Sequence, residues 1–255
     1  MLTSNGLAVV QVPYPIFVAG QRPNAVRYDW LWSGFSEAAI RYASVFDLTR
    51  VGFVGHSFGG GATPEMARRG FVEKGWGAAG RFMFVMAPWY SWGTGYDTLP
   101  GDVRTVIQVY ADDAVNEHDI AVADIWNKLP ATLERRWLMI RSDACGCGLN
   151  AGHVVPICSP DSGSPEDGGT LNGHDAWGVW RRVHALAAYA FNGDVAASDV
   201  AYGIDTAMGK WIGCGSRDIR PLESATTPIV DHCQADVTYP LALRCDSADS
   251  DVICP

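Results

Sequence analysis

The stretch Gly55-His56-Ser57-Phe58-Gly59 holds the side chain whose type and setting point most directly to chemistry, the hydroxyl of Ser57. It matches G-x-S-x-G, in which a serine occupies a sharp turn between a buried strand and a helix. The alternative is a glycine-rich turn with an incidental serine, but the sequence predicts a strand before Ser57 and a helix after it. A phosphate-binding loop is excluded because no G-x-x-x-x-G-K-[ST] motif is present. We expect Ser57 to be a nucleophile, with the backbone N–H of Phe58 at the helix start stabilising a developing oxyanion.

A nucleophilic serine needs a histidine as base and a carboxylate that orients the histidine. In chains with this motif the acid follows the serine and the histidine follows the acid. Asp112 and Asp113 lie just after the predicted strand 103–110, where the acid is expected. We favour Asp113 because it stands further beyond the end of the strand.

The base is chosen among six histidines. His174 follows the last predicted strand and immediately precedes a long amphipathic helix, so we expect it to be the base. His153, in a cysteine-containing loop, is its rival.

The elements that must position these residues alternate between strands and helices. Apolar runs predict buried strands, and spacing near 3.6 residues predicts helices. The predicted strands are 6–15, 50–57, 80–89, 103–110 and 136–142. The predicted helices are 28–46, 60–72, 119–129 and 175–194. This order indicates an α/β fold, a mostly parallel sheet with helices on both faces, in which ligands bind at the carboxyl ends of the strands.

The chain divides into a catalytic domain, 1–194, and an extension, 195–255, in which the alternation weakens and cysteines recur. We expect the extension to pack on the same domain. Trp89 and Trp92 follow the carboxyl end of a predicted strand and are expected to contact substrate.

Seven cysteines, all in the C-terminal half, favour disulfides and an oxidising compartment, so we expect a secreted or periplasmic protein. A zinc site of Cys145, Cys147, His153 and Cys158 is the alternative, but the C-x-C spacing is tight for a chelate. We expect no metal. Residues 1–5 carry no signal peptide, which we would explain by a natural beginning that lies upstream.

A net charge of −9 without any basic run argues against nucleic-acid binding, and no apolar stretch is long enough to span a bilayer. The expected partner is a small or uncharged molecule, and the protein is expected to be a monomer. Serine chemistry of this kind requires no cofactor.

The segments "LTSNGLAVV", "VGFVGHSFGGGA", "MAPW" and "VIQVYADDAV" resemble the α/β-hydrolase superfamily, and within it the cutinase-like and dienelactone-hydrolase-like bacterial esterases, a group that includes polyester hydrolases. The resemblance covers about residues 2–192. It implies carboxylic ester hydrolysis, with the Trp89 position lining an acyl or aromatic subsite and Phe58 completing the oxyanion hole. "GHSFGG" also resembles acetylhydrolases and lipases that cleave phospholipids.

By the same resemblance, the strand 6–15 corresponds to the family's fourth strand. The earlier strands, and the loop that gives a second oxyanion N–H, would then lie upstream. The sheet is then expected to have an exposed edge where those strands would pair, and the Phe58 N–H to be the one oxyanion donor in this sequence. The alternative is that "PYPIF" (13–17) supplies the second donor.

Overall fold

We describe the fold from a computed structural model of the chain. The structure describes residues 3, 6–13, 24–145, 147–157, 171–211, 214–231, 234 and 237–243.

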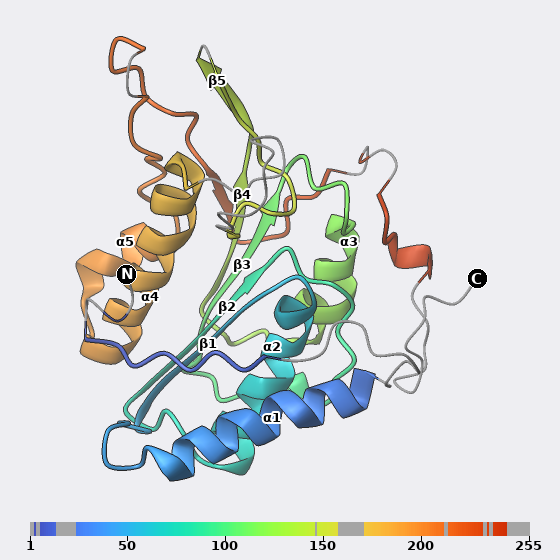
Figure 1. The fold of residues 1–255 in the computed structure, drawn as a ribbon, viewed down its shortest axis with the longest axis vertical. Coiled ribbons are helices and arrows are strands. Elements are labelled where there is room, and N and C mark those ends of the chain that lie inside the picture. Colours follow the sequence, from blue (N-terminus) through green and yellow to red (C-terminus); the bar gives the residue numbers. More distant parts are fainter. Residues whose placement is uncertain are drawn as a thin grey trace.

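One five-stranded sheet organises the fold, in the order β1-β2-β3-β4-β7. Its strands are β1 (Arg50–His56), β2 (Gly80–Met86), β3 (Arg104–Tyr110), β4 (Arg135–Ile140) and β7 (Glu223–Ala225). β1 to β4 are parallel, and β7 pairs antiparallel with β4. The carboxyl ends of β1 to β4 therefore meet at one edge of the sheet (Figure 1).

Helices connect these strands and cover the sheet. They are α1 (Asn24–Arg41), α2 (Phe58–Arg68), α3 (His118–Ile120), α4 (Arg181–Asn192) and α5 (Val195–Ala201). The π-helical segments are η2 (Arg69–Glu73), η4 (Ala121–Ile125) and η7 (His174–Trp180), and the 3-10 turns are η3 (Tyr96–Thr98), η5 (Trp126–Lys128) and η8 (Leu241–Leu243). η7 runs directly into α4, and Gly193, the residue after α4, adopts the left-handed conformation (φ 68°) that often ends a helix.

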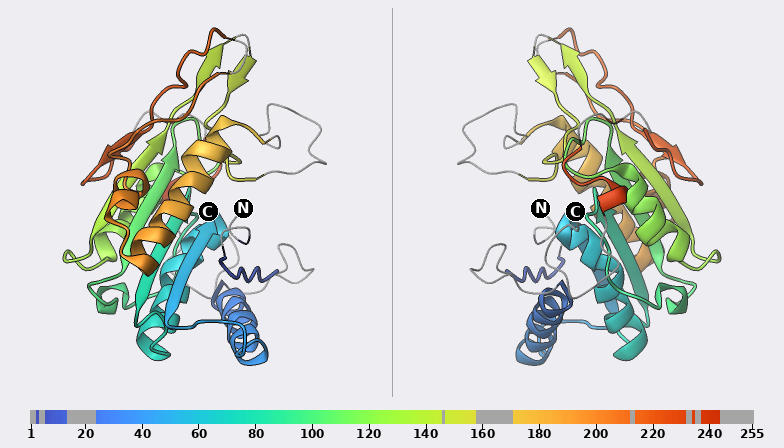
Figure 2. Two further views of the ribbon diagram at one scale, coloured as in Figure 1. Left: turned by 90° about the vertical axis from the view of Figure 1, so that its left-hand side faces the viewer. Right: turned by 90° about the vertical axis from the view of Figure 1, so that its right-hand side faces the viewer.

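Two hydrophobic cores lie on opposite faces of the sheet, and successive residues of a strand contribute side chains alternately to one core and to the other. In β2, Met83 and Val85 join the core under α1 and α2, whereas Phe82 and Phe84 join the core under α4 and α5. The same division of the helices is visible in Figure 2. The expectation of an α/β fold with a mostly parallel sheet is confirmed, because strands buried on both faces read as continuous apolar runs.

The predicted strand 6–15 is wrong for its described part. Residues 7–13 form no strand in the structure, and residues 14 and 15 lie outside the described ranges. Leu7 packs against the core under α4, and Val12 packs against the core under α1. A β-branched, apolar run thus finds burial through side-chain contacts and without a sheet partner.

A small hairpin that the sequence did not predict follows β4. β5 (Asp143–Cys145) and β6 (Cys147–Leu149) pair antiparallel, and Figure 1 shows the hairpin projecting beyond the main sheet. Within the described ranges, no helix is both long and apolar enough to cross a bilayer.

Candidate active site

Ser57 occupies the turn between β1 and α2 with a backbone that few residues other than glycine adopt. Its φ of 55° and ψ of −120° lie outside the ordinary regions for an L-residue. The turn is held from three sides: Ser57 N–H donates to the Met86 carbonyl at 3.1 Å, and the Ser57 carbonyl accepts from Gly61 at 3.0 Å and from Trp89 at 2.8 Å. A strained serine fixed in this way is typical of a functional site.

The glycines around this turn have different reasons to be glycine. A side chain at Gly55 would collide with the Gly59 carbonyl, 2.1 Å from the added Cβ. An added Cβ at Gly59 meets nothing within 4 Å, but one at Gly61 would lie 2.4 Å from the Tyr90 carbonyl. Gly55 therefore permits the close approach of β1 to the first turn of α2, and Gly61 permits that of α2 to the segment after β2.

His153, in the turn after β6, joins Ser57 to Asp113. Its Nε2 lies 2.9 Å from Ser57 Oγ, and its Nδ1 lies 2.9 Å from Asp113 Oδ2. An ionised carboxylate only accepts hydrogen bonds, so Nδ1–H donates to Asp113 and Nε2 is left to accept from the Ser57 hydroxyl. The side chains of His153 and Asp113 are 10% and 1% exposed, which keeps water away from this contact line.

Asp113 lies in the loop after β3, and this loop orients its carboxylate. The backbone N–H groups of Val115 and Asn116 both donate to Oδ1, at 2.8 and 2.9 Å. The other oxygen, Oδ2, is thereby directed at His153. The structure thus brings Ser57 and Asp113 together, the two residues that the sequence paired.

His174 is not at this site, and its placement as the base needs correction. It is the first residue of η7 and is fully buried, with Nδ1 3.4 Å from the Asn150 carbonyl. Burial lowers the pKa of His174. The position beside Ser57 is taken by His153, because the chain after the β5–β6 hairpin returns to the carboxyl ends of β3 and β4.

A second histidine, His56, contacts His153 through its ring and a hydrogen bond. The Nε2–H of His56 donates to the His153 backbone carbonyl at 2.7 Å, and the two rings lie 4.6 Å apart. Burial, and after it the charge that His153 can carry, lower the pKa of His56 to about 3. His56 is therefore neutral at ordinary pH and adds no charge beside the His153 ring.

Asp112 also stabilises the turn that carries His153, through hydrogen bonds to Ser142 and Ala151. The Ser142 hydroxyl donates to the Asp112 carboxylate and accepts the Ala151 N–H at 2.7 Å, while Asp112 N–H donates to the Ala151 carbonyl at 3.0 Å. These bonds fix the chain two residues before His153.

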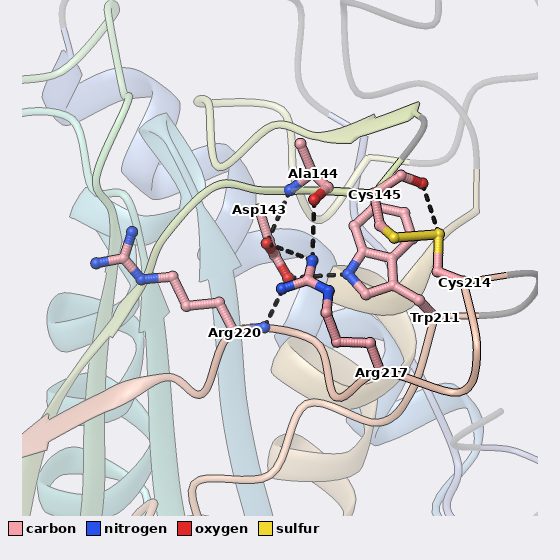
Figure 3. The surroundings of a disulfide bond; sticks show 7 residues. All are labelled: Asp143, Ala144, Cys145, Trp211, Cys214, Arg217 and Arg220. Carbon is pink, nitrogen blue, oxygen red and sulfur yellow. Dashed lines mark hydrogen bonds and ion pairs between the residues drawn. A yellow bond between two sulfur atoms is a disulfide. The ribbon is translucent and has the colours of Figure 1, made fainter.

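The hairpin that leads into the His153 turn is anchored by a disulfide between Cys145 and Cys214 (Figure 3). Beside it, Asp143 accepts from Trp211 Nε1 at 2.9 Å and from Arg217 at 2.8 Å. Burial opposes ionisation of Asp143, but these hydrogen bonds outweigh burial and lower the pKa of its carboxyl. The expectation of disulfide pairing is confirmed at this pair.

The zinc alternative receives no support from this arrangement. Cys145 is bonded to Cys214, and the His153 ring is engaged by Ser57 and Asp113. The described part of the chain contains no group of three or more His, Cys, Asp or Glu that could hold a metal ion. Cys158 lies outside the described residues.

A cluster of aromatic side chains begins at Phe58, the residue after Ser57. Phe58 is buried at the start of α2, and its ring lies 6.0 Å from that of Trp89. Trp89 also meets Trp92 at 6.4 Å and Tyr239 of the C-terminal segment at 5.7 Å. The sequence found both tryptophans but missed Tyr239, which lies far along the chain and in no recognisable element.

The expected oxyanion donor, the Phe58 N–H, belongs to the first residue of α2, at the positive end of the helix dipole. The suggested second donor in 13–17 falls almost entirely outside the described residues, and the one described residue, Pro13, has no N–H.

Comparison with known proteins finds no matching family model and no matching curated protein.

Proposed function

We propose that the chain is a serine hydrolase of the α/β-hydrolase type that cleaves carboxylic esters. The observation that carries this proposal is the contact line from Ser57 Oγ through His153 to Asp113, with 2.9 Å at both junctions. Three residues from three separate loops at the carboxyl edge of a parallel sheet give the geometry that nucleophilic serine catalysis requires.

In the proposed reaction, His153 Nε2 takes the Ser57 proton as Oγ attacks the ester carbonyl. The negative oxygen of the tetrahedral intermediate is stabilised by the Phe58 N–H at the positive end of α2. His153 then gives the proton to the leaving alcohol, which leaves an acyl ester on Ser57. A water molecule, deprotonated by His153, attacks this ester, and the acid is released as Ser57 regains its proton.

Asp113 stabilises the imidazolium that forms in each half of this cycle and keeps His153 in the required tautomer. Its near-complete burial strengthens this interaction, because the local dielectric constant is low. No cofactor is required.

The substrate class is proposed from the aromatic cluster of Phe58, Trp89, Trp92 and Tyr239. A cluster of flat apolar side chains that begins at the residue after the nucleophile favours an uncharged acyl or aromatic group. We therefore propose short-chain acyl esters as substrates, with lipids and polyesters as further members of the class. The Cys145–Cys214 disulfide supports secretion or a periplasmic location.

The proposal is tested by labelling with a fluorophosphonate, which reacts with activated serines, and by turnover of p-nitrophenyl esters. The wild-type protein should be labelled once, at Ser57, and Ser57→Ala should lose labelling and at least about 10³-fold in turnover. Acetyl, octanoyl and aromatic esters, a phospholipid and a polyester film then define the substrate. Absence of labelling in folded wild-type protein would favour a non-catalytic, hydrolase-like binding protein.

A further inference from the structure

The segment after β7 crosses over the loop that carries the proposed acid. The described residues of this segment, 226–231, 234 and 237–243, lie between β7 and the side of α3 (Figure 1). Thr238 N–H donates to the Ala114 carbonyl at 3.0 Å and Tyr239 N–H to the Val115 carbonyl at 2.7 Å, while Glu117 N–H donates to the Tyr239 carbonyl at 3.2 Å. The extension therefore pairs with the acid loop, residues 111–117, through an isolated parallel β-bridge between Asn116 and Tyr239.

One side chain of this segment, Gln234, contacts the acid loop at both ends. Its Nε2 donates to the backbone carbonyl of Asp113 at 2.8 Å and to that of Asn116 at 3.3 Å. Its Oε1 accepts the backbone N–H of His118 at 2.8 Å. The Gln234 carboxamide thus makes three hydrogen bonds, two as donor and one as acceptor, to the backbone between Asp113 and His118.

The two carbonyls that Gln234 holds belong to the residues that set the direction of the Asp113 carboxylate. Asn116 N–H donates to Asp113 Oδ1, and this bond leaves Oδ2 for His153. A change in the distance between the backbones of Asp113 and Asn116 would rotate the carboxylate away from the His153 ring.

The far end of the loop is held independently of Gln234. His118 Nε2–H donates to the Tyr110 carbonyl at 2.8 Å, and His118 Nδ1 accepts the Asp231 N–H at 3.2 Å. The Tyr90 hydroxyl also donates to the Pro240 carbonyl at 2.6 Å. A variant that lacks the Gln234 carboxamide therefore retains the other bonds that fasten the segment, and we expect it to fold.

We propose that Gln234 is a positioning residue of the hydrolytic site, which fixes the acid loop so that the Asp113 carboxylate faces His153. This inference rests on the proposed function. It makes the C-terminal extension part of the catalytic arrangement, although its residues lie more than 100 positions beyond Asp113 in the sequence.

The expected effect falls on the chemical step. Gln234→Met is similar in size and removes all three hydrogen bonds, and it should lower kcat by about 10- to 100-fold, as small misplacements of reacting groups do. KM should change by less than about threefold, because Gln234 acts through Asp113 and not on bound substrate.

Two further variants separate positioning from general support. Gln234→Glu keeps an acceptor for the His118 N–H but loses both donors to the carbonyls, so it should be as slow as Gln234→Met. Thr238→Val removes one hydroxyl hydrogen bond of the same segment, from Oγ1 to the Ala114 carbonyl at 3.3 Å, and leaves the backbone bond from Thr238 N–H to the same carbonyl in place. It should have wild-type kcat.

A signature that is independent of turnover is the low-field proton resonance of His153 Nδ1–H bonded to Asp113, assigned by its loss in His153→Ala. It should be present in the wild type and Thr238→Val and be lost or shifted upfield in both Gln234 variants. Unchanged resonance and kcat in a folded Gln234→Met protein would overturn the inference. Absence of Ser57 labelling in the folded wild type would instead overturn the proposed function. In that case the resonance would still show whether Gln234 positions the Asp113 carboxylate against His153.

Discussion

Asp112 and Asp113 are neighbours in the sequence, yet their carboxylates hold two different parts of one site. Asp113 is buried and meets His153 Nδ1 at 2.9 Å. Asp112 is exposed and accepts the Ser142 hydroxyl, which in turn binds the backbone just before His153. One aspartate touches the imidazole, and the other fixes the chain that carries it.

This difference predicts unequal effects of the same substitution. Asp113→Asn replaces a carboxylate that accepts from His153 and should lower kcat by about 10³-fold or more, because an amide cannot stabilise the imidazolium. In Asp112→Asn the amide oxygen still accepts from Ser142, so kcat should stay within about threefold. Ester kinetics on both folded variants measure this difference. If Asp112→Asn proves as slow as Asp113→Asn, the assignment of Asp113 as the acid is wrong.

A parallel comparison separates the two histidines. His153→Ala removes the proposed base and should cost about 10³-fold or more in kcat/KM. His174→Ala removes a buried ring that packs under Asn150, so it should lower the melting temperature while the kcat of the folded fraction stays near wild type. Thermal melts and active-site titration with a fluorophosphonate give both quantities. An active His153→Ala protein beside a folded, inactive His174→Ala protein would restore His174 as the base.

The fold was largely predictable because β2 to β4 are buried on both faces and therefore read as apolar runs. β1, at the edge of the sheet, was found from its apolar run although only Phe53 in it is buried. β7 was not predictable, since Glu223-Ser224-Ala225 has neither an apolar run nor alternation and is placed by its pairing with β4. The strand predicted over residues 7–13 was wrong for the opposite reason. The apolar, β-branched run is visible in the local sequence, but the sequence does not show whether a neighbouring strand is present to pair with it.

The site shows the same limit. Chain order predicted that Ser57 and Asp113 meet at one site, and His153 joins them there, but both His153 and His174 satisfy that order. The contacts in the fold separate the two histidines. The His153 ring meets Ser57 and Asp113, whereas His174 Nδ1 lies 3.4 Å from the Asn150 carbonyl. These contacts join residues that are far apart in the sequence, so the sequence order could not reveal them.

The disulfide gives a prediction on stability. Cys145 and Cys214 are 69 positions apart, and closing a loop of that length stabilises a fold by up to about 4 kcal/mol in the chain-entropy model. The double variant Cys145→Ser, Cys214→Ser should therefore unfold at lower denaturant concentration than the wild type. The hairpin leads into the His153 turn, so kcat should fall as well, although by less than in His153→Ala.

Mass mapping without reduction provides the control for this measurement, because it shows whether the two cysteines are joined in the wild type. Ser142→Ala is the matched variant, since it loosens the same turn without touching the disulfide. Alkylation of Cys145 and Cys214 in unreduced wild-type protein would contradict the pairing.

The last prediction concerns acid stability and follows from His56. Its pKa of about 3 in the folded protein lies below its ordinary value of 6.5, so the unfolded chain binds the His56 proton more tightly than the folded protein does. The stability that this difference contributes is fully present above about pH 6.5 and is lost as the pH falls toward 3, with a slope approaching about 1.4 kcal/mol per pH unit.

His56→Gln isolates this contribution, because glutamine offers an N–H to the His153 carbonyl but does not titrate. Between about pH 7 and pH 5, the wild type should lose about 2 kcal/mol more unfolding free energy than His56→Gln, measured by chemical denaturation. His118 and His174, whose pKa values burial also lowers, remain in both proteins, so their contributions cancel in the difference. Parallel stability curves for the two proteins would mean that His56 is hydrated in the folded state and does not lie packed beneath the His153 ring.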